Sequence, residues 1–392
     1  MNEEPPLSLP TPQTSCPLFT LLPAEIRNRI YQFALESEDT ATDELSSRLR
    51  YRRDAFFYRP GFKQPKRITT ALLQTCQQIY AEASLLPPAV NEHTFWFYRG
   101  PPHIKYPSSP VPYFSSMSPK QRAAVYHLHF FTQQYFLEEH WTKVFEGMRV
   151  GGEGGEGGEG GEGGEGGEGG EGEGGGEEES GSSKCIIAPK KLTITLRHTD
   201  WWYWENNDTL GIDPFRPGRT HAADMGKAVS ALAGKGWGHR FSYISSLEEL
   251  VIEFETIMRK KDQLDAIIQR ALEWRFPMKQ DKSLYLVADP ESKSAYTWIG
   301  AKEAHLKRGG RIRGILPRRR VFFVPAPDQQ PEIPPPPPHS VDEQEDFAIP
   351  ILKPFDPSSA QDNRPGLDTE KEEEFYVVFL TWRLQLVEER FI

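Results

Sequence analysis

The first 90 residues contain two stretches in which apolar residues recur at helical spacing. In the first, which begins at Leu22, an apolar residue returns every three or four positions and charged residues fill the gaps. The second, residues 72–83, repeats this pattern between a threonine N-cap at 69 or 70 and the pair Pro87-Pro88, which would end a helix. We therefore expect two amphipathic helices, each burying one apolar stripe. The stripes comprise Leu22, Ile26, Ile30, Phe33 and Ala34 in the first helix and Leu72, Cys76, Ile79, Tyr80 and Ala83 in the second.

Later segments change to the period of a β-strand. Three of them alternate apolar and polar residues, which is typical of strands buried on one face. A fourth, near the end of the sequence, is almost continuously apolar and rich in aromatic and β-branched residues, which indicates a central strand. Helical patterns occur between these segments, so βα-type units are expected. The expected strands span 125–130, 191–196, 249–254 and 375–382, and the expected helices span 222–233 and 261–275.

Two low-complexity tracts interrupt these patterns. One contains the triplet Gly-Gly-Glu seven times in succession, and the other contains five consecutive prolines before an acidic run. Neither composition can bury a core. The first is interpreted as an expanded surface loop or an acidic segment for basic partners, and the second as a spacer or a ligand for SH3 or WW grooves. The chain divides into a disordered tail (1–17), a helical module with the first strands (18–150), a Gly/Glu loop (151–184), an α/β part (185–324), a disordered loop (325–374) and a C-terminal core strand (375–392).

These patterns predict one α+β domain with disordered insertions, in which the N-terminal helical pair packs on a mixed β-sheet with helices. The 392 residues carry a formal charge of -10, but eleven glutamates lie in 151–183 and leave the remainder close to neutral. The sequence has no apolar run long enough to span a bilayer and no signal-peptide pattern at its start. We therefore expect a cytoplasmic or nuclear protein that does not bind membranes.

Familiar catalytic signatures do not occur in the sequence. It has no phosphate-binding loop, no G-x-S-x-G, no H-E-x-x-H and no kinase motif set. The three cysteines, Cys16, Cys76 and Cys185, are too far apart for a CxxC zinc or redox site. The sequence therefore predicts a protein that is not an enzyme and that uses no catalytic residue, cofactor or metal.

Histidine pairs provide two weaker alternatives. Two strand histidines separated by one residue could bind a metal if a third ligand came near, although such histidines more often face solvent or a helix. A histidine two residues before an aspartate could act as a general base with its orienting carboxylate, but no nucleophile accompanies it. The metal candidates are His127 and His129 with His140 or Glu138, and the base candidates are His198 and Asp200.

Two further segments could recognise a partner. The run Trp201-Trp-Tyr-Trp204 has more aromatic residues than one buried face can use, so Trp201 and Tyr203 could form a recognition platform. The alternative is that Trp202 and Trp204 fill the core while the other two rings pack beneath a loop. Residues 302–320 hold eight Lys/Arg and one Glu, a composition that suits phosphate binding or nuclear import.

The N-terminal motifs resemble those of a known family. Residues 19–35 read FTLLPAEIRNRIYQFAL, residues 72–83 read LLQTCQQIYAEA, and residues 91–97 read NEHTFWF. Over residues 19–98 the chain is similar to the large family of fungal F-box-like proteins of unknown function, with a charged insert at 36–67 between the two helices. The resemblance implies a helical recognition module without catalytic activity. A true F-box docks the Skp-type subunit of a ubiquitin ligase.

Together these features predict a non-enzymatic protein-interaction module, in the form of an F-box-like substrate adaptor of a ubiquitin ligase. Its expected partners are proteins, including a Skp-type ligase subunit. The alternative is a nuclear nucleic-acid-associated protein that acts through residues 302–320. The candidate interaction residues are Leu22, Pro23, Glu25, Ile26, Arg27 and Ile30 in the first helix, Trp201 and Tyr203 in the aromatic run, and Arg318, Arg319 and Arg320 in the basic block.

Overall fold

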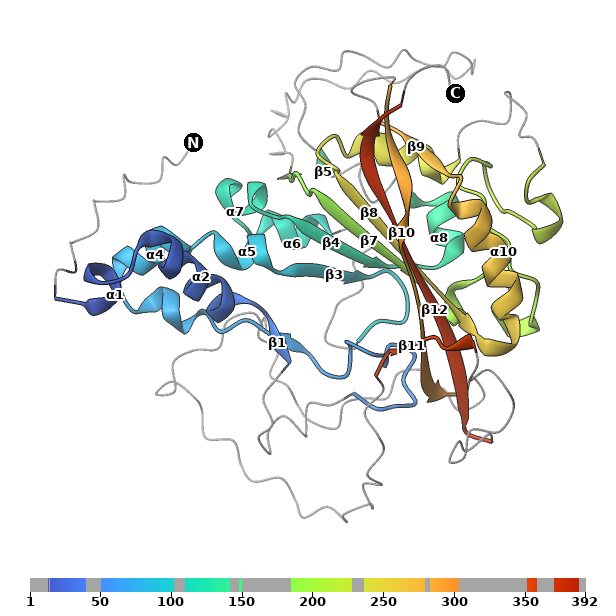
Figure 1. The fold of residues 1–392 in the computed structure, drawn as a ribbon, viewed down its shortest axis with the longest axis horizontal. Helices are drawn as coiled ribbons and strands as arrows, with labels where there is room; N and C mark the ends of the chain where they lie inside the picture. The colour runs from blue at the N-terminus through green and yellow to red at the C-terminus, as the bar shows by residue number, and fades with distance from the viewer. Residues whose placement is uncertain are drawn as a thin grey trace, which may run out of the picture.

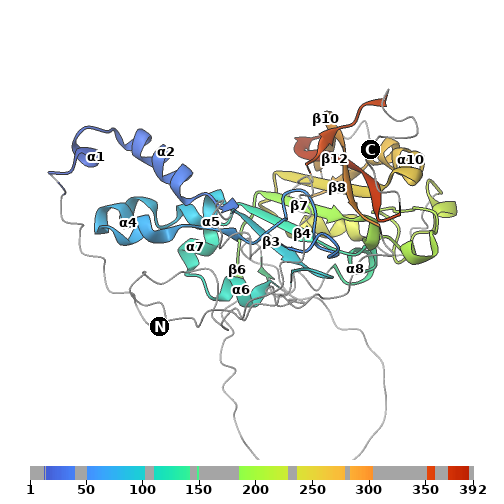
Figure 2. The same ribbon diagram turned by 90° about the horizontal axis from the view of Figure 1, so that it is seen from below.

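A twisted, mixed β-sheet forms the main body of the protein, and a group of short helices extends from one of its edges (Figures 1 and 2). This architecture confirms the expected α+β class. The Gly/Glu tract before residue 185, the basic block from residue 303 onward and the five prolines lie outside the described part. The computed structural model describes residues 13, 15–39, 51–101, 110–141, 148–149, 185–227, 236–278, 283–302, 351–357 and 370–387.

The sheet joins a parallel half to an antiparallel half. Strands β3, β4, β7 and β8 run parallel in that order, β12 pairs antiparallel with β8, and β10 and β11 follow beyond β12. All four expected strands are present, and β12 is central as its apolar sequence predicts. The bounds are β3 Glu92–Trp96, β4 His127–Phe131, β7 Lys191–Leu196, β8 Glu249–Ile257, β9 Arg275–Pro277, β10 Leu284–Ala301, β11 Lys353–Pro354 and β12 Glu372–Leu386, with β9 paired to β10.

Two features of the antiparallel half differ from expectation. The long strand β10 was not predicted, because charged residues around a register shift between Asp289 and Ser294 break its apolar pattern. The disordered loop was predicted to extend to residue 374, but β11 and the start of β12 lie within that range. Backbone pairing with β10 orders both, at Thr297↔Lys353 and Ala301↔Glu372. The predicted boundary at 375 is therefore wrong.

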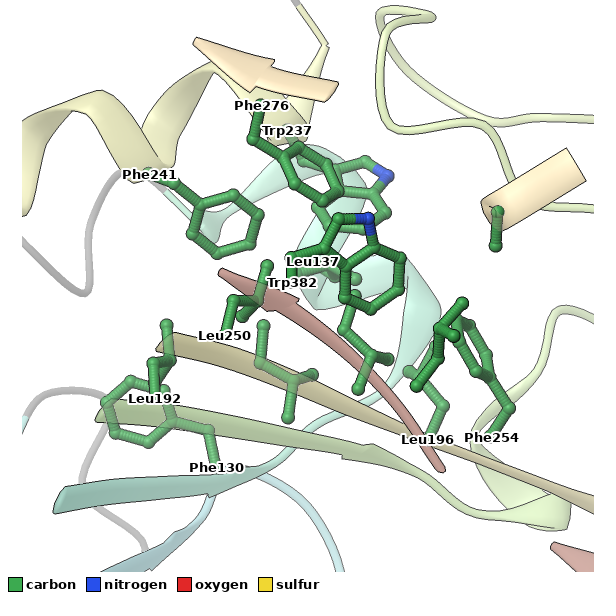
Figure 3. Close-up of a cluster of buried hydrophobic side chains, with 14 of the residues drawn as sticks. Phe130, Leu137, Leu192, Leu196, Trp237, Phe241, Leu250, Phe254, Phe276 and Trp382 are labelled. Carbon is green, nitrogen blue, oxygen red and sulfur yellow. The ribbon is translucent and has the colours of Figure 1, made fainter. Parts of the chain in front are cut away.

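One face of the sheet carries the main apolar core. Helices α8 (Gln134–Glu139), α10 (Lys261–Ala271) and the 3-10 helix η5 (Trp237–Tyr243) pack over it. Helix α10 lies within the predicted span 261–275 but ends at Ala271, because Arg275 already begins β9; its buried residues are Leu264, Ile267, Ile268 and Ala271. Complete burial of a large apolar side chain contributes about 1.5–3 kcal/mol relative to exposure. Figure 3 shows Phe130, Leu192, Leu196, Leu250, Phe254 and Trp382 from the strands beside Leu137, Trp237, Phe241 and Phe276 from the covering elements and β9.

The opposite face of the sheet is partly polar, and residues 51–67 pack on part of it. Within this segment, the ring of Phe62 lies edge-on to Trp96 and Phe131, with centroids 5.4 and 4.9 Å away. Two short strands, β1 (Glu38–Asp39) and β2 (Lys66–Arg67), pair with each other at the ends of the insert. The charged insert between the two N-terminal helices is therefore part of the sheet domain over residues 51–67.

The N-terminal helices form a small cluster of their own beside edge strand β3 (Figures 1 and 2). Tyr31, Leu35, Ile79 and Ala83 are its buried residues and are separate from the main core. The prediction that the pair packs on the sheet is therefore wrong for these apolar side chains. The elements are α1 Pro17–Thr20, α2 Ala24–Leu35, η1 Thr70–Gln74, α4 Gln77–Ala83 and α5 Leu86–Val90.

The second predicted helix is divided in two. Cys76 adopts an extended backbone and caps α4, with its Sγ accepting from the Ile79 amide, so the helix is interrupted there. Leu72, Cys76, Ile79 and Ala83 nevertheless pack in one cluster as predicted, whereas Tyr80 is 47% exposed. Pro87 and Pro88 lie in the first turn of α5 instead of ending a helix, because proline is tolerated where the amide has no helical partner.

The predicted helix at 222–233 is also not formed over its described part. Only η4 (Ala222–Asp224) is helical, and Gly226 has a left-handed φ of 79°. Within the described residues, no helix is both long and apolar enough to cross a membrane. The remaining elements are α6 Val111–Ser115, α7 Pro119–Ala123, η2 His198–Asp200, η3 Trp204–Asn206, η6 Met258–Lys260, β5 Met148–Arg149 and β6 Cys185–Ile186.

Candidate functional site

Helix α2 exposes the apolar stripe that its sequence pattern predicted to be buried. The side chains of Ile26, Ile30 and Phe33 are 50%, 41% and 59% exposed. The buried face of the helix consists instead of Tyr31 and Leu35, both fully buried. The prediction of a buried stripe is therefore wrong, and we call the three exposed residues the α2 face.

A bidentate ion pair fixes the orientation of α2 about its own axis. Arg27 donates from Nε and Nη2 to the two carboxylate oxygens of Glu82 on α4, at 3.0 and 2.9 Å, and from Nη1 to the carbonyl of Leu22 at 2.8 Å. Tyr31 donates its hydroxyl to the same carboxylate at 3.1 Å. These contacts bring Arg27 and Tyr31 to the side of α2 that faces α4, so Ile26 and Ile30 are directed away from it. We call Arg27, Tyr31 and Glu82 the latch.

The latch changes the interpretation of the predicted interaction residues in α2. Arg27 is occupied within the molecule and only 12% of its side chain is exposed, so its role is structural. Pro23 is the exposed N-cap residue of α2, Glu25 is exposed in its first turn, and Leu22 is half-buried. Sequence reasoning missed Tyr31 and Glu82, since their pairing depends on a contact across more than fifty residues.

Acid should loosen the latch. Hydrogen bonding and attraction from Arg27 lower the pKa of Glu82 below its usual 4.5, while partial burial opposes this effect. A lowered folded-state pKa means that the carboxylate stabilises the fold above its unfolded pKa and that this contribution is lost as the pH falls through the folded value. Amide exchange of α2 at pH 3 should therefore exceed that at pH 6 after correction for intrinsic rates. In a Glu82→Gln variant this pH dependence should disappear, and its persistence there would contradict the assignment to Glu82.

The aromatic run 201–204 does not form a continuous platform. Trp201 and Trp204 are buried in the main core, which makes the prediction of Trp201 as an interaction residue wrong. Trp202 is half-buried and its indole donates to Glu138, whose pKa burial raises to about 7. Tyr203 alone is exposed, with a left-handed φ of 47°. The guanidinium of Arg219 lies 4.1 Å from its ring centroid.

The two histidines of β4 belong to a polar row across the sheet and do not form a metal site. His129 Nε2 lies 2.8 Å from the Thr195 hydroxyl and Nδ1 lies 2.9 Å from Glu92. The Thr195 hydroxyl donates in turn to Glu253, which extends the row to β8. His127 contacts Thr193, and burial lowers its pKa to about 4. Within the described residues, no three His, Cys, Asp or Glu side chains are placed to bind a metal.

His198 and Asp200 do not form the suggested acid–base pair. Both carboxylate oxygens of Asp200 accept from the Arg197 side chain, at 2.6 and 2.9 Å. Burial lowers the pKa of His198 to about 3, so its imidazole is neutral, and its Nδ1 has no hydrogen-bond partner in the described structure. The aspartate therefore orients an arginine instead of a histidine.

Arg59 of the insert lies next to these residues, with its side chain buried against strand β8. It is 3% exposed, and its Nη2 pairs with both Glu253 and Glu255 of β8. Glu255 also accepts from the backbone amide of His198 and from the indole of Trp298. Sequence reasoning missed Arg59, because a single arginine in a charged insert gives no signal that it will be buried.

Of the candidate residues predicted from the sequence, the structure thus brings Pro23, Glu25, Ile26 and Ile30 onto one exposed helix and leaves Tyr203 on a different surface. Arg318, Arg319 and Arg320 lie outside the described residues. No protein-family model, no curated protein and no solved structure matches this chain.

Proposed function

We propose that this protein is a non-enzymatic docking module that binds another protein through the α2 face. The observation that carries the proposal is the exposure of three large apolar side chains on one side of a helix whose other side is fixed. Ile26, Ile30 and Phe33 follow the i, i+4, i+7 spacing with which an amphipathic helix fills an apolar groove of a partner. Isolated exposed apolar residues are common, but an aligned row of this kind is typical of an interaction site.

The latch supports this proposal because it holds α2 in one orientation. Arg27 and Tyr31 both contact Glu82, which fixes the rotation of the helix about its axis before any partner arrives. A preorganised helix loses less conformational entropy on binding than a flexible one. The guanidinium of Arg29 also lies 4.5 Å from the ring centroid of Phe33, which restricts that side chain.

As the partner we propose a Skp-type ligase subunit, with the protein acting as a substrate adaptor in the cytoplasm or nucleus. The resemblance of residues 19–35 and 72–83 to F-box-like sequences supports this choice. The exposed positions Pro23, Glu25, Ile26 and Ile30 belong to the LPAEIRNRI segment that carries the resemblance. The nucleic-acid alternative depends on residues 302–320, almost all of which lie outside the described structure, so no contact in the described part favours it.

Replacing Ile26 and Ile30 together by serine should weaken binding of the purified full chain to a Skp-type subunit at least about tenfold, because each buried aliphatic anchor contributes roughly 1–3 kcal/mol. Isothermal titration calorimetry measures this loss. Ile351→Ser is the matched control, since Ile351 is an isoleucine that is 62% exposed outside the N-terminal cluster. Equal binding by the double variant and the control would refute the α2 face, and no binding by the unaltered chain would refute the Skp-type partner.

A further inference from the structure

A carboxyl group on helix α8 lies at the contact between this helix and the segment 201–220. Glu138 is half-buried, and its two oxygens accept from the Gln134 side-chain amide at 2.9 Å and from the Trp202 indole at 2.5 Å. Gln134 joins the same two elements a second time, because it also donates to the carbonyl of Gly211 at 2.6 Å. Glu138 therefore belongs to the hydrogen-bond cluster that fastens the segment to α8. No residue of the α2 face takes part in it, so this cluster is independent of the proposed docking function.

The side chains that donate to this carboxyl group are neutral. Within the described residues, no side chain of lysine, arginine or histidine forms an ion pair with Glu138. Removal from water without a counter-charge disfavours the ionised form. Burial accordingly raises the pKa of Glu138 from 4.5 to about 7, although the hydrogen bonds from Trp202 and Gln134 oppose the shift. The charge of this group therefore changes near neutral pH, well above the range of an exposed glutamate.

The backbone around Trp202 limits any movement of this contact to a short turn. Trp201 and Trp204 on either side are buried in the main core, and the indole of Trp201 also donates to the carbonyl of Glu255 at 2.8 Å. Tyr203 has a left-handed φ of 47°, a conformation that is uncommon for a residue with a Cβ and that occurs often in switch regions. The two residues 202–203 therefore form a strained turn between two fixed tryptophans.

The charged and titratable side chains nearest to this contact are engaged elsewhere. Tyr135 of α8 lies edge-on to Trp202, with ring centroids 5.4 Å apart, and hydrogen-bonds to His140. Arg219 stacks on the rings of Trp202 and Tyr203 and lies 3.8 Å from Asp208. His140 is the group among these whose ordinary pKa is also close to neutral. The other charged or titratable groups of α8, of the segment and of η5, which packs against α8, are Glu139, Glu205, Asp213, Arg216, His239 and Arg240.

We propose that Glu138 and Trp202 form a pH-sensitive contact, which is closed while the Glu138 carboxyl is protonated and opens when this group ionises. Opening admits water to the carboxylate, whose pKa then returns to that of an exposed glutamate. Because the closed state binds the proton more tightly than the open one, closure is favoured at acid pH, weakens as the pH rises from about 4.5 to about 7, and changes no further above this range. Opening also displaces the exposed ring of Tyr203, which alters this surface near neutral pH.

The indole N–H of Trp202 reports the state of this contact. Its hydrogen exchange, measured by NMR on the isotope-labelled full chain and corrected for the intrinsic rate, should be at least about fivefold faster at pH 7.5 than at pH 5.5, because between the two pKa values each pH unit shifts the equilibrium up to about tenfold. A Trp202→Phe variant identifies the signal. Equal corrected rates at the two pH values, or faster exchange at pH 5.5, would overturn the proposal.

Glu138→Gln should abolish the pH dependence, because glutamine carries no charge at either pH while its side-chain oxygen can still accept from the indole. The corrected exchange of this variant should be slow at both pH values. Glu139→Gln is the matched control, since Glu139 is the neighbouring, exposed glutamate of the same helix, and it should leave the pH dependence unchanged. Persistence of the pH dependence in Glu138→Gln would assign it to another group, such as His140, and would overturn the proposal.

Discussion

Arg59→Met should lower the free energy of unfolding by about 3–5 kcal/mol. The substitution keeps much of the side-chain volume but leaves Glu253 and Glu255 buried without their cation, and an uncompensated buried charge is costly. Urea denaturation followed by tryptophan fluorescence measures the loss. Arg52→Met is the matched control, because Arg52 pairs with Asp54 at an exposed position where an ion pair contributes roughly 0–1 kcal/mol.

Neutralising the two carboxylates should recover much of this loss. In a triple variant that combines Arg59→Met with Glu253→Gln and Glu255→Gln, no buried charge remains unpaired at this place, and buried ion pairs can often be replaced at little cost. Burial already raises the pKa of Glu255, so the Arg59→Met variant should be more stable at mildly acidic pH than at neutral pH. If the Arg59→Met variant were as stable as the Arg52→Met control, the ion pairs of Arg59 with Glu253 and Glu255 would not stabilise the fold.

Two identical substitutions in the N-terminal cluster should have opposite outcomes. Ile79 is only 5% exposed, so Ile79→Asp buries an unpaired carboxylate and should destabilise the cluster by more than about 3 kcal/mol. Ile26 is half-exposed, so Ile26→Asp should change stability by no more than about 1 kcal/mol while it weakens docking.

Hydrogen exchange resolved by segment tests this pair. Because the cluster around Tyr31 and Ile79 is separate from the main core, Ile79→Asp should remove the protection of α2 and α4 and leave that of β7 and β8 intact. Ile26→Asp should retain protection in all four elements. Loss of protection in α2 for both variants would mean that the α2 face is packed against the rest of the protein in solution.

The strands could be predicted because their apolar residues recur with the backbone period of a strand, although the polar residues between them, such as Thr193 and Thr195, are buried as well. Lys191–Leu196 was predicted at its observed bounds, since each apolar residue of that segment contacts the same core. The buried face of helix α2 could not be predicted in the same way. Helix α2 has a second apolar pair, Tyr31 and Leu35, and the choice between its two faces depends on a carboxylate more than fifty residues away.

In the aromatic run, residues 201–204, the local backbone differs from the strand that the sequence pattern assumed. Strand alternation would group Trp202 with Trp204, but residues 201–203 form a turn between η2 and η3, in which Trp201 is extended and Tyr203 is left-handed, and this turn directs Trp201 and Trp204 into the core together. A pocket at the carboxyl ends of β7 and β8 had no sequence signal, because its walls come from the insert and from the ends of β7, β8, β10 and β12. Only the fold brings Arg59, Arg197 and His198 together.

The position of β12 has a consequence for the synthesis of this protein. It is the last described strand in chain order, yet it lies between β8 and β10 in the middle of the sheet. While the chain is still on the ribosome, β8 must therefore expose a row of unpaired backbone groups until residues 372–386 emerge. Exposed strand edges of this kind promote aggregation, and slow long-range pairing prolongs the exposure. The nascent polypeptide is consequently expected to depend on chaperones until residues 372–386 have emerged, and ribosomes that stall before residue 372 should release products that are cleared rather than folded.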